Sequence, residues 1–263
     1  MTKTEKELAF LRGIYVEPEY TAKFTELFNE NVVVDGVSTI TYVNAGAGGH
    51  AIEIGDKLGE GVDVFPVCED AELREIAQQK SESVKSGVDF STEAPLARSE
   101  MAIADASLIT PRLVDDFLES AAKCSSGRFA FFLPTAGSFG EVFSILWEVL
   151  LDEGLENKGE AVENLITEIK TVSQAEEAAL ALGLTKVQSI SKPEMLEFEN
   201  GESFVDSPLV RYFFLPEWLS FLDDEETERV LKGLAEKIDD DRNEITFRTS
   251  VKATVIWGEK TGG

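Results

Sequence analysis

The segment Asn44-Ala-Gly-Ala-Gly-Gly-His50 places small residues between a short β-rich stretch and a helical pattern. Glycines at such a junction let a ligand approach the backbone closely, and the following helix offers unpaired amide N–H groups at the positive end of its dipole. In an open parallel sheet, ligands bind at the carboxyl ends of the strands, where the strand order reverses. The segment is therefore the first candidate for a binding site, and a tight turn without a ligand is the alternative.

Two side chains are candidates for acid–base chemistry. Asp105 follows the apolar segment Met101–Ala104. A carboxylate at the carboxyl end of a central strand can orient an acceptor or act as a base, and a helix N-cap or a loop hydrogen bond is the alternative. His50 is the only histidine and stands at a helix start, so it either contacts a ligand or supports local structure. One histidine excludes a multi-histidine metal site, and it disfavours a Ser-His-Asp hydrolase.

Cys68 and Cys124 are the only cysteines, and they lie far apart without a CxxC pair. This arrangement is typical of buried thiols in a reducing compartment rather than of a disulfide framework or a zinc site. No cationic residue adjoins Cys68 in the sequence, so a small buried hydrophobe is favoured over a nucleophile. The sequence therefore predicts no metal site.

The 263 residues include 24 Lys plus Arg and 50 Asp plus Glu, a formal net charge of −26. Such a surface repels nucleic-acid phosphates and anionic membranes, so neither is expected as a partner. The excess favours solubility or a salty medium, and a specific basic partner is the alternative. The charged start lacks the apolar core of a signal peptide, and no apolar run reaches the roughly 18 to 20 residues of a membrane span. We therefore expect a cytoplasmic protein.

Strand and helix patterns alternate along the chain, which indicates right-handed βαβ units on a parallel sheet covered by helices on both faces. We expect strands over residues 38–43, 62–68, 88–90, 101–104, 129–133, 186–190 and 245–257. We expect one or two helices within residues 3–30, and further helices up to residue 58 and over residues 69–86, 111–123, 139–151, 159–169, 174–182 and 223–239. The sequence thus predicts an α/β three-layer sandwich with a seven-stranded, mostly parallel sheet.

A single domain is expected over residues 1–263, because the length and the 43% hydrophobic content suit one large core. N-terminal helices occupy residues 1–37. Residues 192–244 interrupt the alternation as an inserted cap segment or subdomain, whose aromatic side chains either cover an apolar substrate or pack on the sheet: Tyr212, Phe213, Phe214 and Trp218. The apolar helix over residues 139–151 forms part of an acceptor pocket, the subunit interface of a homodimer, or ordinary core.

Residues 38–257 resemble the class I S-adenosylmethionine-dependent methyltransferases, in the manner of methyltransferase type 11 proteins. The first motif of that family is an acid ending strand one, then a Gly-x-Gly-x-Gly loop and an apolar helix. Here Gly46 and Gly48 match the glycines, whereas Tyr42 stands where the family has its acid and Asn44 where it has its first glycine. The resemblance makes these four residues cofactor-binding positions.

Three further motifs carry the same resemblance. The family places an acid at the end of strand two to bind the ribose hydroxyls, and here Cys68 occupies that position with Glu69 immediately after it. In the third motif an acid followed by alanine faces the adenine, and Glu93 with Ala94 matches it. Asp105 lies just beyond strand four, where the family places groups that contact the methyl donor or acceptor. Cofactor contacts are therefore implied for all five residues.

The resemblance implies a Rossmann-like methyltransferase fold with an antiparallel last strand, S-adenosylmethionine as cofactor, and methyl transfer to a small-molecule acceptor with Asp105 as the catalytic residue. The cofactor motif is degenerate, because Tyr42 and Cys68 replace acids. Charge-assisted hydrogen bonds are about twice as strong as neutral ones, so each lost acid costs about 1–3 kcal/mol of binding free energy. A catalytically inactive scaffold that acts as a binding or interaction protein is the alternative. The glycine spacing and the missing strand-two acid disfavour a nicotinamide or nucleotide-sugar oxidoreductase.

Overall fold

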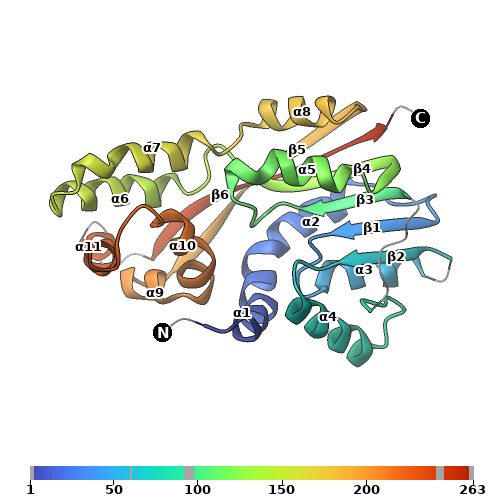
Figure 1. Ribbon diagram of the computed structural model, residues 1–263, viewed down its shortest axis with the longest axis horizontal. Helices are drawn as coiled ribbons and strands as arrows, with labels where there is room; N and C mark the ends of the chain where they lie inside the picture. Colours follow the sequence, from blue (N-terminus) through green and yellow to red (C-terminus); the bar gives the residue numbers. More distant parts are fainter. Residues whose placement is uncertain (1–2, 60, 92–97, 241–245, 261–263) are drawn as a thin grey trace. The chain divides into compact units, whose positions relative to one another are not determined.

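The computed structural model describes residues 3–59, 61–91, 98–240 and 246–260 (Figure 1). The chain forms two compact units. The first comprises residues 1–133, 172–192 and 253–263, and the second comprises residues 134–171 and 193–252. The single domain over residues 1–263 stays a prediction, and the expected insertion over residues 192–244 belongs to the second unit from Pro193 onward.

Six strands of the described residues form one sheet in the order β2-β1-β3-β4-β6-β5. Their bounds are β1 Thr39–Val43, β2 Asp63–Val67, β3 Ser99–Asp105, β4 Ser125–Thr135, β5 Leu184–Phe198 and β6 Phe247–Lys260. β1 pairs in parallel with β2 and β3, and β3 pairs in parallel with β4. β6 runs antiparallel to β5, because Thr185 contacts Glu259 whereas Ser191, later on β5, contacts Thr254, earlier on β6. The α/β class and the antiparallel last strand are confirmed.

Helices connect the strands and build the second unit. The α-helices are α1 Glu5–Leu11, α2 Ala22–Asn31, α3 Gly49–Leu58, α4 Ala71–Val84, α5 Val114–Ala122, α6 Gly140–Asp152, α7 Gly159–Thr167, α8 Val172–Ala181, α9 Gly201–Asp206, α10 Leu215–Trp218 and α11 Asp224–Asp240. Two π-helices, η1 Arg12–Thr21 and η4 Val210–Phe214, and two 3₁₀ turns, η2 Pro111–Leu113 and η3 Glu156–Lys158, complete the described elements.

Alternating side chains of β4 show how the sheet of the first unit is covered on both faces. Phe129 and Phe131 belong to a buried apolar cluster with residues of α5 and α8 (Figure 1). Phe132 points to the opposite face and contacts Phe24 and Phe28 of α2, with ring centroids 6.1 and 6.3 Å away. A strand buried on both faces is apolar along its whole length, which explains the run of apolar residues in β4.

The strand expected over residues 88–90 is absent from this described segment, so the prediction of seven strands is wrong. Side chains of α4 take hydrogen bonds that a neighbouring strand would otherwise make. Ser81 Oγ donates to the Val88 carbonyl (2.5 Å), and Phe90 N–H donates to Gln78 Oε1 (2.8 Å). Because α4 takes up these backbone hydrogen bonds of residues 88–90, the segment does not pair with β2, and β2 stays at the edge of the sheet.

The N-terminal helices α1, η1 and α2 follow one another without a break. η1 contains Pro18, which has no N–H to donate, and wide π-helical turns are common at functional sites. At Gly13, a Cβ atom would lie 3.2 Å from Cβ of Ala47. The missing side chain therefore lets η1 lie close to the glycine loop.

An aromatic cluster forms part of the core of the second unit. Phe139 and Phe143, at α6, pack against Phe214 and Trp218 with ring centroids 5.0 to 6.2 Å apart. Phe214 and Trp218 are buried, which favours packing over an open substrate lid for these two residues. In the described part of the chain, no helix has the length and apolar content that a membrane crossing requires.

Gly48→Ala tests how tightly the loop is packed. Gly48 precedes α3 with φ +86°, and a Cβ atom there would lie 2.6 Å from Phe90 Cζ and 2.8 Å from Ala77 Cβ. Backbone strain and overpacking together should lower the free energy of unfolding by about 2–4 kcal/mol, measured by urea denaturation. Gly36→Ala is the control, because Gly36 has φ +75° but no atom within 4 Å, and it should cost about 1 kcal/mol. Equal losses at both positions would contradict this packing.

Candidate functional site

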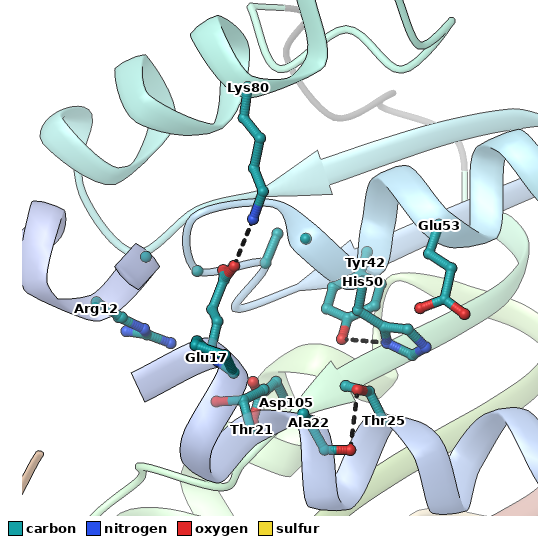
Figure 2. Close-up of a pocket in the computed structure, with 15 residues that line it drawn as sticks. Arg12, Glu17, Thr21, Ala22, Thr25, Tyr42, His50, Glu53, Lys80 and Asp105 are labelled. Atoms are coloured by element: carbon teal, nitrogen blue, oxygen red, sulfur yellow. Dashed lines mark hydrogen bonds and ion pairs between the residues drawn. The ribbon is translucent and has the colours of Figure 1, made fainter. Parts of the chain in front are cut away.

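A cavity of about 280 Å³ lies at the carboxyl ends of β1 and β3 in the first unit (Figure 2). β1 lies between β2 and β3 in the sheet. After β1 the chain crosses to β2 on one side of it, and after β2 it crosses to β3 on the other side, so the strand order reverses at β1. Such a reversal of strand order is where open α/β sheets bind ligands. The cavity is lined by Arg12, Gly13, Glu17, Pro18, Thr21, Ala22, Thr25, Tyr42, Ala45, Gly46, Gly49, His50, Glu53, Lys80 and Asp105.

The loop after β1 turns through positive φ angles at Asn44 (+62°) and Gly46 (+57°). Asn44 Nδ2 donates to the backbone carbonyl of Asp105 (3.1 Å), and Ala45 N–H donates to the Val67 carbonyl (3.0 Å). The loop is thus fastened to the ends of both neighbouring strands. Asparagine adopts this conformation more readily than most other residues, so Asn44 can stand where the resembling family has a glycine.

Charged side chains of η1 lie over this loop. Arg12 forms an ion pair with one oxygen of Glu69, whose other oxygen accepts from Gly46 N–H (3.1 Å). Glu17 forms an ion pair with Lys80 of α4 (2.7 Å). A Cβ atom at position 46 would lie 3.3 Å from both Arg12 Nε and Glu17 Oε1. The N-terminal segment therefore covers the loop, and Glu69 accepts the hydrogen bond of one loop amide.

Asp105 ends β3, lines the cavity and is 4% exposed. Burial raises the pKa of its carboxyl to about 6, against the opposing charge of Arg12 and the N–H donor of Ser107 (2.8 Å). The carboxyl is therefore mostly ionised at neutral pH and takes up a proton slightly below it. A carboxylate with a pKa near the working pH suits general acid–base chemistry.

Tyr42 and His50 meet at the wall of the cavity, with 2.8 Å between the hydroxyl oxygen and Nδ1. Burial, followed by the charge of Lys57, lowers the pKa of His50 to about 3, so its imidazole is neutral. Burial also raises the pKa of Tyr42 well above its usual value, and the negative charge of Asp105 adds to this. Both groups are therefore uncharged hydrogen-bonding partners at neutral pH.

The structure brings five of the predicted site residues together. Tyr42, Gly46 and Asp105 line the cavity. Asn44 and Glu69 hold the residues that line it, through the hydrogen bonds to Asp105 and to Gly46. Their roles toward a ligand stay predictions.

Two other predicted site residues that the structure describes, Cys68 and Gly48, are not part of this lining. Burial raises the pKa of the Cys68 thiol to about 12, which makes it an unreactive buried group. Gly48 precedes α3 and packs beside Phe90. Glu93 and Ala94 lie outside the described residues. No group of three or more His, Cys, Asp or Glu side chains within the described ranges is arranged to hold a metal ion.

Sequence reasoning missed the charged groups that cover the loop. Arg12 and Glu17 come from η1, and Lys80 comes from α4. The signal that could have found them is the pair Gly13 and Pro18, which interrupts an otherwise helical pattern. Helix breakers inside such a pattern often mark a close approach or a functional site.

One buried hydroxyl oxygen of the cavity lining, Thr21 Oγ1, has no hydrogen-bond partner among the described residues. Thr21 is 8% exposed. A buried polar group without a partner costs about 1–3 kcal/mol of folding free energy. This atom indicates that the cavity accommodates a polar ligand or ordered water.

The sequence matches no family model and no curated protein. Solved structures do match it. YcgJ from Bacillus subtilis has a TM-score of 0.57 at 14% identity, over 92% of this chain and 100% of that one. An S-adenosylmethionine-dependent methyltransferase from Geobacter sulfurreducens, in complex with S-adenosylhomocysteine, has a TM-score of 0.54 at 10% identity, over 99% and 100%. A putative methyltransferase from Bacillus halodurans, BH2331, has a TM-score of 0.53 at 11% identity, over 90% and 99%.

Identities of 10 to 14% show the fold alone. The chain has the fold of the class I S-adenosylmethionine-dependent methyltransferases, with a mostly parallel sheet and an antiparallel closing strand. The resemblance inferred from the sequence motifs is confirmed at this level.

The raised pKa of Asp105 predicts a stability that depends on pH. Its folded-state pKa of about 6 exceeds the usual 3.8, so the folded protein keeps a proton that the unfolded chain releases between these values. Rising pH through this window should lower the free energy of unfolding, by on the order of 3 kcal/mol in total. Above about pH 7 this contribution is constant.

Asp105→Asn supplies the comparison, because asparagine does not ionise. Urea denaturation at several pH values should show wild type losing stability relative to this variant from about pH 4 to about pH 6. Parallel profiles for the two proteins would contradict a raised pKa at this position.

Proposed function

We propose that the chain binds S-adenosylmethionine in this cavity and transfers its methyl group to a small-molecule acceptor. The observation that carries the proposal is the position of the cavity, between the glycine loop after β1 and the buried carboxyl of Asp105 at the end of β3. Open α/β sheets bind ligands at this position. The Geobacter sulfurreducens methyltransferase of the same fold, solved in complex with S-adenosylhomocysteine, supports this choice of ligand.

The side chains around the cavity fit a zwitterionic ligand. Arg12 suits a carboxylate, and the Tyr42 oxygen suits an ammonium group. The unpartnered Thr21 Oγ1 offers a further hydrogen bond. Glu69, just after β2, is the carboxylate that could accept from a ribose hydroxyl once its ion pair with Arg12 opens. The chemistry of the set therefore agrees with S-adenosylmethionine, even though two acids of the resembling family are replaced.

The proposal requires the covering side chains to move. The cavity volume of about 280 Å³ lies just below the roughly 300–1,000 Å³ usual for small-molecule sites. Arg12 and Glu17 lie over Gly46, so they must swing away from the loop for the whole ligand to enter. The side chains of these ion pairs are only 11 to 39% exposed, so separating them costs more than the roughly 1 kcal/mol or less that an exposed surface pair contributes. Contacts with the ligand must offset this cost.

S-adenosylmethionine supplies an electrophilic methyl group on a sulfonium. The task of the protein is then to position the reactants and to move a proton. At neutral pH the Asp105 carboxyl, with its pKa of about 6, is ionised and accepts a proton from a hydroxyl or amine acceptor. Asn44 ties the backbone of Asp105 to the glycine loop, so the base and the ligand-binding backbone keep a fixed relation.

The proposed methyl acceptor is a small molecule. The formal net charge of −26 disfavours a nucleic-acid acceptor, because its phosphates would be repelled. A cytoplasmic location and a homodimer stay predictions from the sequence.

Calorimetric titration with S-adenosylhomocysteine tests the ligand. We expect saturable binding in the micromolar range and about tenfold or greater weakening by Gly46→Val, whose side chain would occupy the space over the loop that Arg12 and Glu17 must leave to the ligand. Gly36→Val is the matched control, because Gly36 also has positive φ but lies outside the cavity lining. It should bind like wild type. No heat and no thermal shift at millimolar ligand would overturn the proposal and leave the inactive scaffold.

Asp105→Asn tests the proposed base. Methyl transfer to an acceptor found by screening amines and phenols should slow about 10²- to 10⁴-fold. In wild type, kcat/KM should rise as pH passes through about 6, since only the ionised carboxyl accepts a proton. The variant should lack this rise. Full activity with an unchanged pH profile would show that Asp105 only supports the loop.

A further inference from the structure

Four side chains form a hydrogen-bonded series at the wall of the cavity, from an exposed carboxylate to a buried hydroxyl. Asn29 Nδ2 donates to Glu53 Oε1 (2.9 Å), and His50 Nε2 lies 3.1 Å from Asn29 Oδ1. The Tyr42 hydroxyl lies 2.8 Å from His50 Nδ1. Glu53 is exposed, whereas Tyr42 is buried. Figure 2 shows Tyr42 and His50 joined in this way, with Glu53 beside them.

The direction of each hydrogen bond follows from the carboxylate at the surface. A carboxylate only accepts, so Asn29 turns its NH₂ group to Glu53 and its carbonyl oxygen to His50. A carbonyl oxygen also only accepts, so His50 carries its proton on Nε2 and leaves Nδ1 bare. The bare nitrogen requires a donor, so the Tyr42 hydroxyl donates to it.

Packing and burial hold His50 in this role. Its ring meets the rings of Phe28, Tyr42 and Phe132 edge-on, with centroids 5.3, 5.5 and 6.2 Å away. Because burial lowers its pKa to about 3, it takes up no second proton at neutral pH. His50 is therefore a fixed and neutral link between Asn29 and Tyr42.

We infer that this series commits the hydrogen of the Tyr42 hydroxyl to His50, so that its oxygen meets the cavity as a hydrogen-bond acceptor only. Glu53, Asn29 and His50 are then positioning residues. The cavity selects a ligand whose buried polar group is a donor, and above all an ammonium group. A freely rotating tyrosine hydroxyl would accept or donate and would make no such distinction.

The charges around the cavity favour the same ligand group. Asp105 lines the cavity, and its negative charge acts on Tyr42. Arg12 and Lys80, the cations of the lining, are engaged in ion pairs with carboxylates. A second carboxylate in place of Tyr42 would repel Asp105 and favour protonation of one of the two. A neutral acceptor avoids that repulsion.

The inference rests on the proposed function only for the identity of the ligand, whose ammonium group would be the amino group of S-adenosylmethionine. The direction of the hydrogen bonds does not depend on it.

The tautomer of His50 tests the direction. Because His50 is the only histidine, protein labelled with ¹⁵N-histidine gives one pair of imidazole nitrogen signals in an NMR spectrum at pH 7. We expect a protonated Nε2 and a bare Nδ1. A protonated Nδ1, or an imidazolium ion, would overturn the inference.

Glu53→Lys tests whether the surface residue sets the direction. An ammonium group in place of the carboxylate should turn Asn29 around, move the proton of His50 to Nδ1 and point the hydrogen of Tyr42 into the cavity. Glu30→Lys is the control, because it makes the same charge change at an exposed position next to Asn29, and it should keep the wild-type tautomer. An unchanged tautomer in folded Glu53→Lys protein would overturn the inference. If that variant does not fold, the wild-type spectrum decides.

The affinities for two ligands, with and without an amino group, test whether the cavity selects an ammonium group. Calorimetry should show wild type binding S-adenosylhomocysteine about tenfold or more tightly than its analogue without the amino group, as one charge-assisted hydrogen bond predicts. Tyr42→Phe should reduce this difference, because only the charge of Asp105 then favours the ammonium group, and it should keep the affinity for the analogue. An undiminished difference in this variant would overturn the selection by Tyr42. Equal affinities in wild type would overturn the selection. If neither compound binds, the proposed function fails together with the selection, and the histidine spectrum still decides the hydrogen-bond direction.

Discussion

The turn between β1 and α3 is the constraint on which the rest of the site depends. Positive φ angles at Asn44 and Gly46 bring the backbone back over the ends of the strands, where no side chain of the loop fills the space. Other segments approach because of this. Phe90 packs against Gly48, and Arg12 of η1 lies over Gly46. The cavity, its covering and the start of α3 all follow from a loop that presents backbone instead of side chains.

Burial then gives the groups around this loop their chemical character. The same low-polarity surroundings raise the pKa of Asp105, lower that of His50 and keep Tyr42 protonated. One carboxylate near its titration point therefore stands beside two neutral hydrogen-bonding groups. Tyr42 carries no charge where the resembling family has an acid, and it thereby avoids a second buried carboxylate next to Asp105. In our inference, the hydrogen-bonded series through His50 makes the Tyr42 oxygen an acceptor toward the cavity, whereas a freely rotating hydroxyl would accept or donate.

Apolar periodicity predicted most of the sheet, because burial on two faces leaves a local signature in the sequence. The run in β4 shows this, although the strand extends from Ser125 to Thr135 and the apolar signature covers only residues 129–133. Residues 88–90 have a similar but shorter apolar pattern and form no strand. Their hydrogen bonds go to Ser81 and Gln78 of α4, and three residues are too few to distinguish a strand from a loop packed on a helix.

The sequence by itself determined the α/β class, the glycine loop, and the placement of Tyr42 and Asp105 near the carboxyl ends of two strands. Only the tertiary structure decided that η1 covers the loop, that Glu69 pairs with Arg12, and that Tyr42 and His50 share a hydrogen bond. The physical reason is the range of each effect. Helix, strand and turn preferences depend on neighbours along the chain, whereas burial, ion pairs and hydrogen-bond direction depend on groups that folding brings together from distant segments.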